Sequence, residues 1–314
     1  MRIALHWAPD QIVVTPTSDH PHGSYTMNTV KSLGLVGLAV SALFAAQAFA
    51  TPLTCPNAPI GGSTTQGSPT CVATTSTDGP GKSLNDLYGP GGSQITGTGL
   101  DIYNGQYTPS AHWQIGGTGG SFNVILTEIA GNANVNTFGI YDPSNPSNML
   151  QLFSGPDSAG AKGTLVYNGG GNFQFALFGQ AATSATFGDG SIFGYYLGTP
   201  GPDGTTLYFY SDPKLNNSAG EAGNPYSDGM HHMVAYQGGN GTSINATGGE
   251  LLNNEFLLGW EDQVFKNSDL DYNDFVVLVE SVHSVPEPAV LGMFGLGVLL
   301  LGGFATLRRR SFKA

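Results

Sequence analysis

The sequence predicts a mainly β protein: an antiparallel β-sandwich of jelly-roll type, with a signal helix at its N-terminus and a single transmembrane helix at its C-terminus. From residue 121 onward, short runs rich in β-branched and aromatic residues alternate with turn sequences, and several runs have a period of two. Glycine supplies 47 of the 314 residues without a fixed repeat, as frequent turns require. A single closed barrel is the alternative architecture. The predicted strands are residues 122–129, 135–142, 149–153, 164–168, 172–179, 192–198, 205–211, 230–237, 255–260 and 275–282.

The first 50 residues contain an export signal. Residues 27–50 combine Lys31, an apolar run and a small-residue site that ends at Ala50, which is the layout of a cleavable secretory signal. We therefore expect signal peptidase to cleave after Ala50. Residues 1–26 do not fit this layout, and we interpret them as an upstream extension that results from a start codon assigned too early.

Residues 51–120 are dominated by Thr, Ser, Gly and Pro and are expected to form a loop-rich leading segment. This segment holds the only two cysteines, Cys55 and Cys71. In an exported chain, a pair at this spacing favours a disulfide, which closes a loop of roughly 15 residues and contributes about 3 kcal/mol to stability. A zinc site is disfavoured because the first histidine after the signal is His112.

The part of the chain between the two ends, residues 51–285, is strongly acidic. It contains four lysines and no arginine, whereas all but three of the chain's 22 acidic residues lie within it. Nucleic-acid binding is excluded because neutralising phosphates requires clustered Lys and Arg. Divalent cations are the natural complement to such a surface, and solubility through charge alone is the alternative explanation.

A dense group of oxygen-bearing side chains precedes the last predicted strand. Because side chains of an extended chain alternate between its two sides, Asp269, Asp271 and Asn273 are expected to converge, with Asp274 beside them. Hard oxygen ligands favour Ca²⁺. With two acids from the end of the preceding predicted strand, the expected calcium ligands are Glu261, Asp262, Asp269, Asp271, Asn273 and Asp274.

Two other interpretations of this segment are possible. An EF-hand loop is rejected because its sixth position should be glycine and is Asp274, and because residues 275–282 predict a strand where a helix should begin. An Asx-rich hairpin, whose carboxylates cap backbone amides and face water, remains the alternative to a metal site.

The C-terminal segment has the length and flanks of a membrane span. Residues 289–307 carry no charge, and a helix of this length reaches about 28 Å at about 1.5 Å per residue. The hydrocarbon core of a bilayer is about 30 Å thick, so the segment predicts a transmembrane helix. The arginines that follow it are expected to stay in the cytoplasm, which places the body of the protein outside.

The whole tail, residues 285–314, closely resembles the bacterial PEP-CTERM sorting signal. The resemblance rests on an ordered series: a Val-Pro-Glu-Pro motif, an apolar span and an arginine cluster. It implies that an exosortase-type enzyme removes the span, so that membrane attachment is transient, and passes the protein to the surface of an exopolysaccharide-producing Gram-negative bacterium. The residues concerned are Val285, Pro286, Glu287, Pro288, Arg308, Arg309 and Arg310.

A second resemblance covers about residues 120–283. Trp-Glu-Asp at 260–262, followed by Asp-x-Asp-Tyr-Asn-Asp at 269–274 and a terminal strand, is similar to the closing motif of a β-rich domain of unknown function found in secreted bacterial surface proteins. That resemblance implies a domain associated with calcium and without an agreed activity. It supports the same six candidate ligands.

Together these observations predict an exported surface or matrix protein, without enzymatic activity, that is structural or adhesive in the exopolysaccharide matrix. The first alternative is a carbohydrate-binding module, in which exposed aromatic side chains stack on sugar rings. The second is a secreted polysaccharide hydrolase that uses Glu261 and Asp262, although consecutive residues of a strand diverge. The aromatic candidates are Trp113, Tyr195, Tyr196 and Tyr208.

Overall fold

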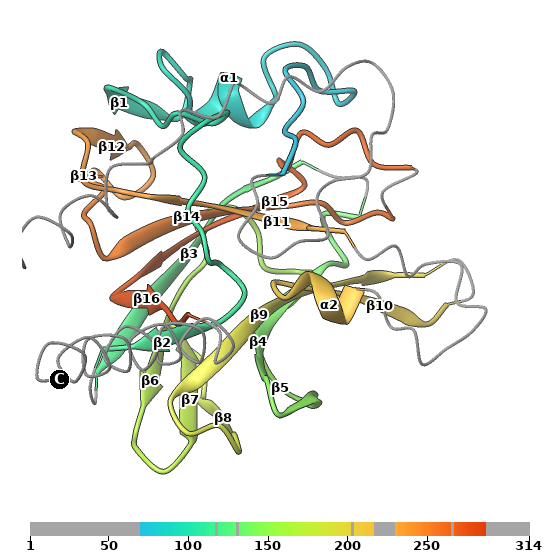
Figure 1. Cartoon of the computed structure of the whole chain (residues 1–314), viewed down its shortest axis with the longest axis vertical. Helices are drawn as coiled ribbons and strands as arrows, with labels where there is room; N and C mark the ends of the chain where they lie inside the picture. The colour runs from blue at the N-terminus through green and yellow to red at the C-terminus, as the bar shows by residue number, and fades with distance from the viewer. Residues whose placement is uncertain are drawn as a thin grey trace, which may run out of the picture. The chain divides into compact units, whose positions relative to one another are not determined.

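In the part of the chain that the structure describes, the fold is mainly β, with antiparallel sheets and two short helices (Figure 1). A computed structural model describes residues 70–116, 119–129, 132–201, 204–216, 230–264 and 267–286. The upstream extension 1–26, the signal 27–50, Cys55 and the tail from Glu287 onward lie outside these residues, so the predictions made for them stay predictions. Within the described ranges, no helix has the length and apolar character that crossing a membrane requires.

The larger sheet has seven strands in the order β11-β14-β15-β3-β6-β7-β8, all antiparallel. Its central strands are buried over nearly their whole length, because both faces of the sheet are covered. The strands are β11 Met233–Gln237, β14 Glu255–Trp260, β15 Phe275–Glu280, β3 Gly120–Glu128, β6 Lys162–Tyr167, β7 Asn172–Leu177 and β8 Thr183–Thr186.

The second sheet has six strands, in the order β16-β2-β9-β4-β5 with β10 also paired to β9. The chain passes into it from the larger sheet at Ser281, which has a φ of 59° and separates β15 from β16. The strands are β16 Val282–Ser284, β2 Trp113–Ile115, β9 Ile192–Pro200, β4 Thr137–Asp142, β5 Asn145–Phe153 and β10 Thr206–Tyr210, and α2 (Pro213–Asn216) follows β10.

The main hydrophobic core contains residues from both sheets. Alternate residues of β15, Phe275, Val277 and Val279, belong to it together with Phe138 of β4 and Tyr195 of β9. Aromatic rings connect the two sets directly, since Phe138 lies 5.2 Å from Phe275 between ring centroids. Two antiparallel sheets around one shared core are compatible with the predicted sandwich and differ from a single closed barrel.

A second core covers the other face of the seven-stranded sheet. The remaining residues of β15, Val276 and Leu278, pack there against α1 (Leu84–Tyr88) and the segment around Val72. A small sheet of β1 (Ile95–Gly97), β12 (Thr242–Ile244) and β13 (Gly249–Glu250) completes this layer, which lies beside β14 in Figure 1. The leading segment therefore contributes to the core as well as to loops, and it reaches the loop that precedes β15.

Candidate metal centre

The described part of the loop between β14 and β15, residues 261–264 and 267–274, has an unusual backbone conformation at two positions. Leu270 and Tyr272 have φ angles of 63° and 55°, in the left-handed region that side chains with a Cβ seldom adopt. The Tyr272 hydroxyl donates to the carbonyl of His231 at 2.7 Å, and the backbone N–H of Ala73 donates to the carbonyl of Leu270 at 2.7 Å. The loop is therefore not the extended chain that the sequence predicted, and its side chains are directed by these contacts.

A glycine in β14 allows this loop to fold back onto the sheet. A Cβ placed on Gly259 would lie 2.7 Å from the backbone oxygen of Tyr272, closer than real Cβ contacts allow. Because any other residue at this position would displace the loop, Gly259 is required for the observed path.

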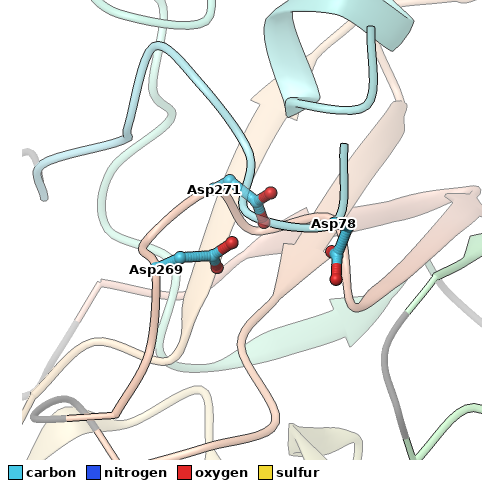
Figure 2. Close-up of side chains that lie close together, drawn as sticks. All are labelled: Asp78, Asp269 and Asp271. Atoms are coloured by element: carbon cyan, nitrogen blue, oxygen red, sulfur yellow. The ribbon is translucent and has the colours of Figure 1, made fainter. Parts of the chain in front are cut away.

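Three aspartates come together at the loop, as Figure 2 shows: Asp78 from the leading segment, and Asp269 and Asp271 from the loop itself. One carboxylate oxygen from each lies within 4.8 Å of the others. Asp271 is fully buried, Asp269 is half-buried and Asp78 is exposed, so the group runs from the interior to the solvent. We call Asp78, Asp269 and Asp271 the Asp triad.

Hydrogen bonds fix two members of the Asp triad. The backbone N–H and the hydroxyl of Thr77 donate to Asp269 Oδ2 at 2.9 and 2.7 Å. The Asn273 amide donates from Nδ2 to Asp271 Oδ2 at 2.6 Å and to the Lys82 carbonyl at 2.7 Å, while its Oδ1 is buried without a hydrogen-bond donor. The leading segment and the loop are thus fastened to each other around the carboxylates.

Electrostatics make the ionised Asp triad unfavourable without a counter-charge. Burial, reinforced by the neighbouring carboxylates of Asp269 and Asp78, raises the pKa of Asp271 to about 7, although a hydrogen bond from Ser76 opposes the shift. The neutral, protonated form of this carboxyl is therefore favoured relative to an ordinary aspartate. A cation placed among the three side chains removes the repulsion that raises its pKa.

The donor set of the Asp triad fits a hard divalent cation. Calcium takes oxygen ligands at about 2.3–2.6 Å, so two ligands on opposite sides of one ion are about 4.8 Å apart. The three carboxylate oxygens lie within this separation, and the buried Oδ1 of Asn273 belongs to the residue that contacts Asp271. Asp78 is the exposed member, so the group meets solvent on its side.

Glu261, a predicted ligand, lies outside the Asp triad and holds the loop through hydrogen bonds. Its carboxylate accepts hydrogen bonds from the backbone N–H of Tyr272 at 2.6 Å and from the hydroxyl of Ser268. Burial and the charge of Asp271 raise its pKa well above the ordinary value. Glu261 therefore fastens the loop to the end of β14, close to the Asp triad but outside it.

Asp262 and Asp274 face another part of the molecule. The backbone N–H of Asp262 donates to Asp274 Oδ2 at 2.8 Å, and the Asn136 amide donates to Asp262 Oδ2 at 2.9 Å. Burial raises the pKa of both carboxyls, and the charges of Glu261 and Asp262 raise that of Asp274 further. Of the six predicted ligands, the structure brings Asp269 and Asp271 into the Asp triad, with Asn273 in contact. The other three, Glu261, Asp262 and Asp274, lie outside the Asp triad, although the charge of Asp271 still acts on Glu261 and Asp274.

Asp78 is the residue that sequence reasoning missed. It stands in the turn sequence Ser-Thr-Asp-Gly-Pro at 76–80, where an aspartate is ordinary. The separation of roughly 190 residues from the loop carries no periodic signal. Only the packing of the leading segment on the seven-stranded sheet places Asp78 beside Asp271.

The aromatic candidates are mostly inside the fold. Trp113 and Tyr195 belong to the main core and are fully buried, and Tyr196 is 3% exposed. Tyr208 is 41% exposed and makes an edge-to-face contact with Tyr196 at 5.6 Å between ring centroids. Of the four predicted sugar-stacking residues, only Tyr208 presents a ring to solvent.

No protein-family model, curated protein or solved structure matches this chain.

Proposed function

We propose that this chain is an exported protein of the cell surface or extracellular matrix, in which calcium stabilises a β-sandwich of jelly-roll type. The support for export is the pair of terminal signals: a secretory signal at 27–50 and a tail that resembles an exosortase-sorted anchor at 285–314. In this proposal signal peptidase and an exosortase-type enzyme process the protein, and its role in the exopolysaccharide matrix is structural or adhesive rather than catalytic.

The Asp triad is the observation that carries the calcium part. It joins Asp78 of the leading segment to Asp269 and Asp271 of the last loop, so an ion bound there ties together two parts of the chain that are distant in sequence. Because the leading segment covers one face of the seven-stranded sheet, the ion stabilises the second core as well as the loop. A cation of this kind increases the free energy of unfolding without taking part in any reaction.

The hydrolase alternative gains no support from the site. Glu261 and Asp262 are each 1% exposed, and both carboxylates accept hydrogen bonds from the chain. Glycoside hydrolysis instead needs two carboxyl groups that flank a bound sugar. The carbohydrate-binding alternative is favoured by Tyr208, whose exposed ring lies next to Tyr196. A glycan array that compares the wild type with Tyr208→Ala tests it.

Two measurements test the main proposal. The exported protein should begin near Thr51 and lack the apolar tail, which intact-mass spectrometry reads directly. Calcium should raise its unfolding temperature relative to the protein in EDTA, whereas magnesium, which demands tighter octahedral geometry, should have a smaller effect. Identical unfolding temperatures in calcium and EDTA would contradict the calcium part, and an unprocessed tail on the surface protein would contradict the sorting part.

A further inference from the structure

A second group of oxygen atoms lies where the two sheets meet, at the same end of the seven-stranded sheet as the loop. Trp260, Phe275 and Glu128 are partners across β14, β15 and β3. Paired residues point to the same face, so Glu128 faces the six-stranded sheet as the core residues Trp260 and Phe275 do. Asp262 follows Trp260 by two residues, and Asn136 stands immediately before β4 of the other sheet.

A contact between the sheets joins Asn136 and Asp262, and Glu128 lies within reach of the Asp262 charge. The Asn136 amide donates from Nδ2 to Asp262 Oδ2 at 2.9 Å, which joins the start of β4 to the end of β14. The backbone N–H of Ile129, next to Glu128, donates to the carbonyl of Asp274 at 3.2 Å. The Asp262 charge is near enough to contribute to the raised pKa of Glu128, after burial as the main cause. We call Glu128, Asn136 and Asp262 the seam group.

Each member of the seam group has one buried oxygen without a donor at good hydrogen-bond geometry: Glu128 Oε1, Asn136 Oδ1 and Asp262 Oδ1. The side chains of Asn132 and Asp274 also lie close enough to Asp262 to lower its pKa, against the larger effect of burial. Asn136 is 2% exposed and Asp262 is 1% exposed, so bulk water does not reach these atoms readily. The Asn136 oxygen shares its amide group with the nitrogen that contacts Asp262, and it therefore lies close to that carboxylate. Buried acceptors without donors are unfavourable, and three in one group indicate a missing positive partner.

We propose that Glu128, Asn136 and Asp262 bind a second divalent cation, separate from the Asp triad, at the seam between the two sheets. Two carboxylates and an amide oxygen are hard ligands of the type that calcium prefers, and they match its charge. The site shares no side chain with the Asp triad. Its consequence is mechanical: an ion held by β3, the end of β14 and the start of β4 fastens one sheet to the other.

Equilibrium dialysis of the full chain over a range of calcium concentrations, at pH 8 and physiological salt, tests the proposal by counting the ions that bind with the wild-type affinity. The wild type should bind two ions per chain. Glu128→Gln, which keeps the side-chain shape and removes a charge, should keep only the ion of the Asp triad. Asp78→Asn should keep only the ion of the seam group. Glu250→Gln, at an exposed position of β13, is the matched control and should keep both.

The outcomes separate the two sites. A wild type that binds one ion, lost in Asp78→Asn and retained in Glu128→Gln, overturns the seam site and leaves the Asp triad intact. A wild-type count that falls in Glu128→Gln and not in Asp78→Asn supports the seam site and overturns the triad. A shared proton in place of a metal gives the same count in Glu128→Gln as in the wild type and refutes the proposal. Because the wild-type count needs no variant, one ion per chain overturns it even if Glu128→Gln does not fold.

Discussion

Replacing Asp78 by asparagine isolates the role of the Asp triad, because Asp78 is the exposed member and is the least involved in the hydrogen bonds of the fold. At a calcium concentration about 100 times its Kd, binding stabilises the wild type by about 2.7 kcal/mol. Loss of one of three carboxylate ligands, at about 1.4 kcal/mol, weakens binding about tenfold and leaves a stabilisation of about 1.4 kcal/mol. Asp78→Asn should therefore halve the response to calcium.

In a chain of this size, 1 kcal/mol corresponds to about 2–4 °C in the unfolding temperature. Calorimetry should therefore find that calcium raises the unfolding temperature by about 5–10 °C in the wild type and by about half as much in Asp78→Asn. In EDTA the variant should match or slightly exceed the wild type, because a like charge has been removed and solvent screens most of its effect. Asp189→Asn, a change at another exposed aspartate, is the control. Equal calcium responses in Asp78→Asn and the wild type would refute the reasoning.

Three further predictions concern pH, the loop and the disulfide. In EDTA, urea unfolding should show that the free energy of unfolding falls as pH rises from about 5 to about 8. The reason is that Asp271 and Glu128 have pKa values raised to about 7 in the folded chain but release their protons near pH 4 when unfolded. With calcium, which needs ionised ligands, this fall should disappear. Glu261→Ala should lower the free energy of unfolding by about 2–4 kcal/mol with or without calcium, since the N–H of Tyr272 loses its acceptor, and an effect seen only with calcium would contradict this. Cys71→Ser should cost about 3 kcal/mol in non-reducing buffer and nothing after reduction, as chemical denaturation would show.

The strands that were predicted from the sequence are those whose own residues show the pattern of a buried face. Each predicted run overlaps a strand of the structure, because alternation such as that of Phe173 and Phe175 in β7 already states which face is buried. Strands such as β8, which is largely exposed, and β13, with two residues, have no such pattern. These strands form because their backbone groups pair with a neighbouring strand. Which strand lies next to them cannot be predicted from the local sequence.

The candidate site was predictable only where its residues are close in sequence. Asp269 and Asp271 are two residues apart, so their meeting required no knowledge of the fold. The expectation that Asp262 joins them came from its place at the end of the preceding predicted strand and from the resemblance of the Trp-Glu-Asp motif. In the structure, Asn136 of the other sheet donates to the Asp262 carboxylate at the seam. Asp78 and Glu128 carried no local signal, since one lies in an ordinary turn and the other ends a strand as a single acid.

The acidity of the site agrees with the export that the terminal signals imply, in which the chain is made inside the cell and then moved outside. A centre with one exposed aspartate and few charged ligands would bind calcium weakly, in the range of the extracellular modules, with Kd values of about 10⁻⁴–10⁻³ M. In a cell interior with little free calcium, such a site stays without metal, and the buried Asp271 carboxyl opposes closure of the leading segment onto the sheet. If the chain is exported as proposed, calcium outside the cell would reverse that opposition. We therefore expect the chain to reach its full stability only after export, when the leading segment and the last loop close around the ion.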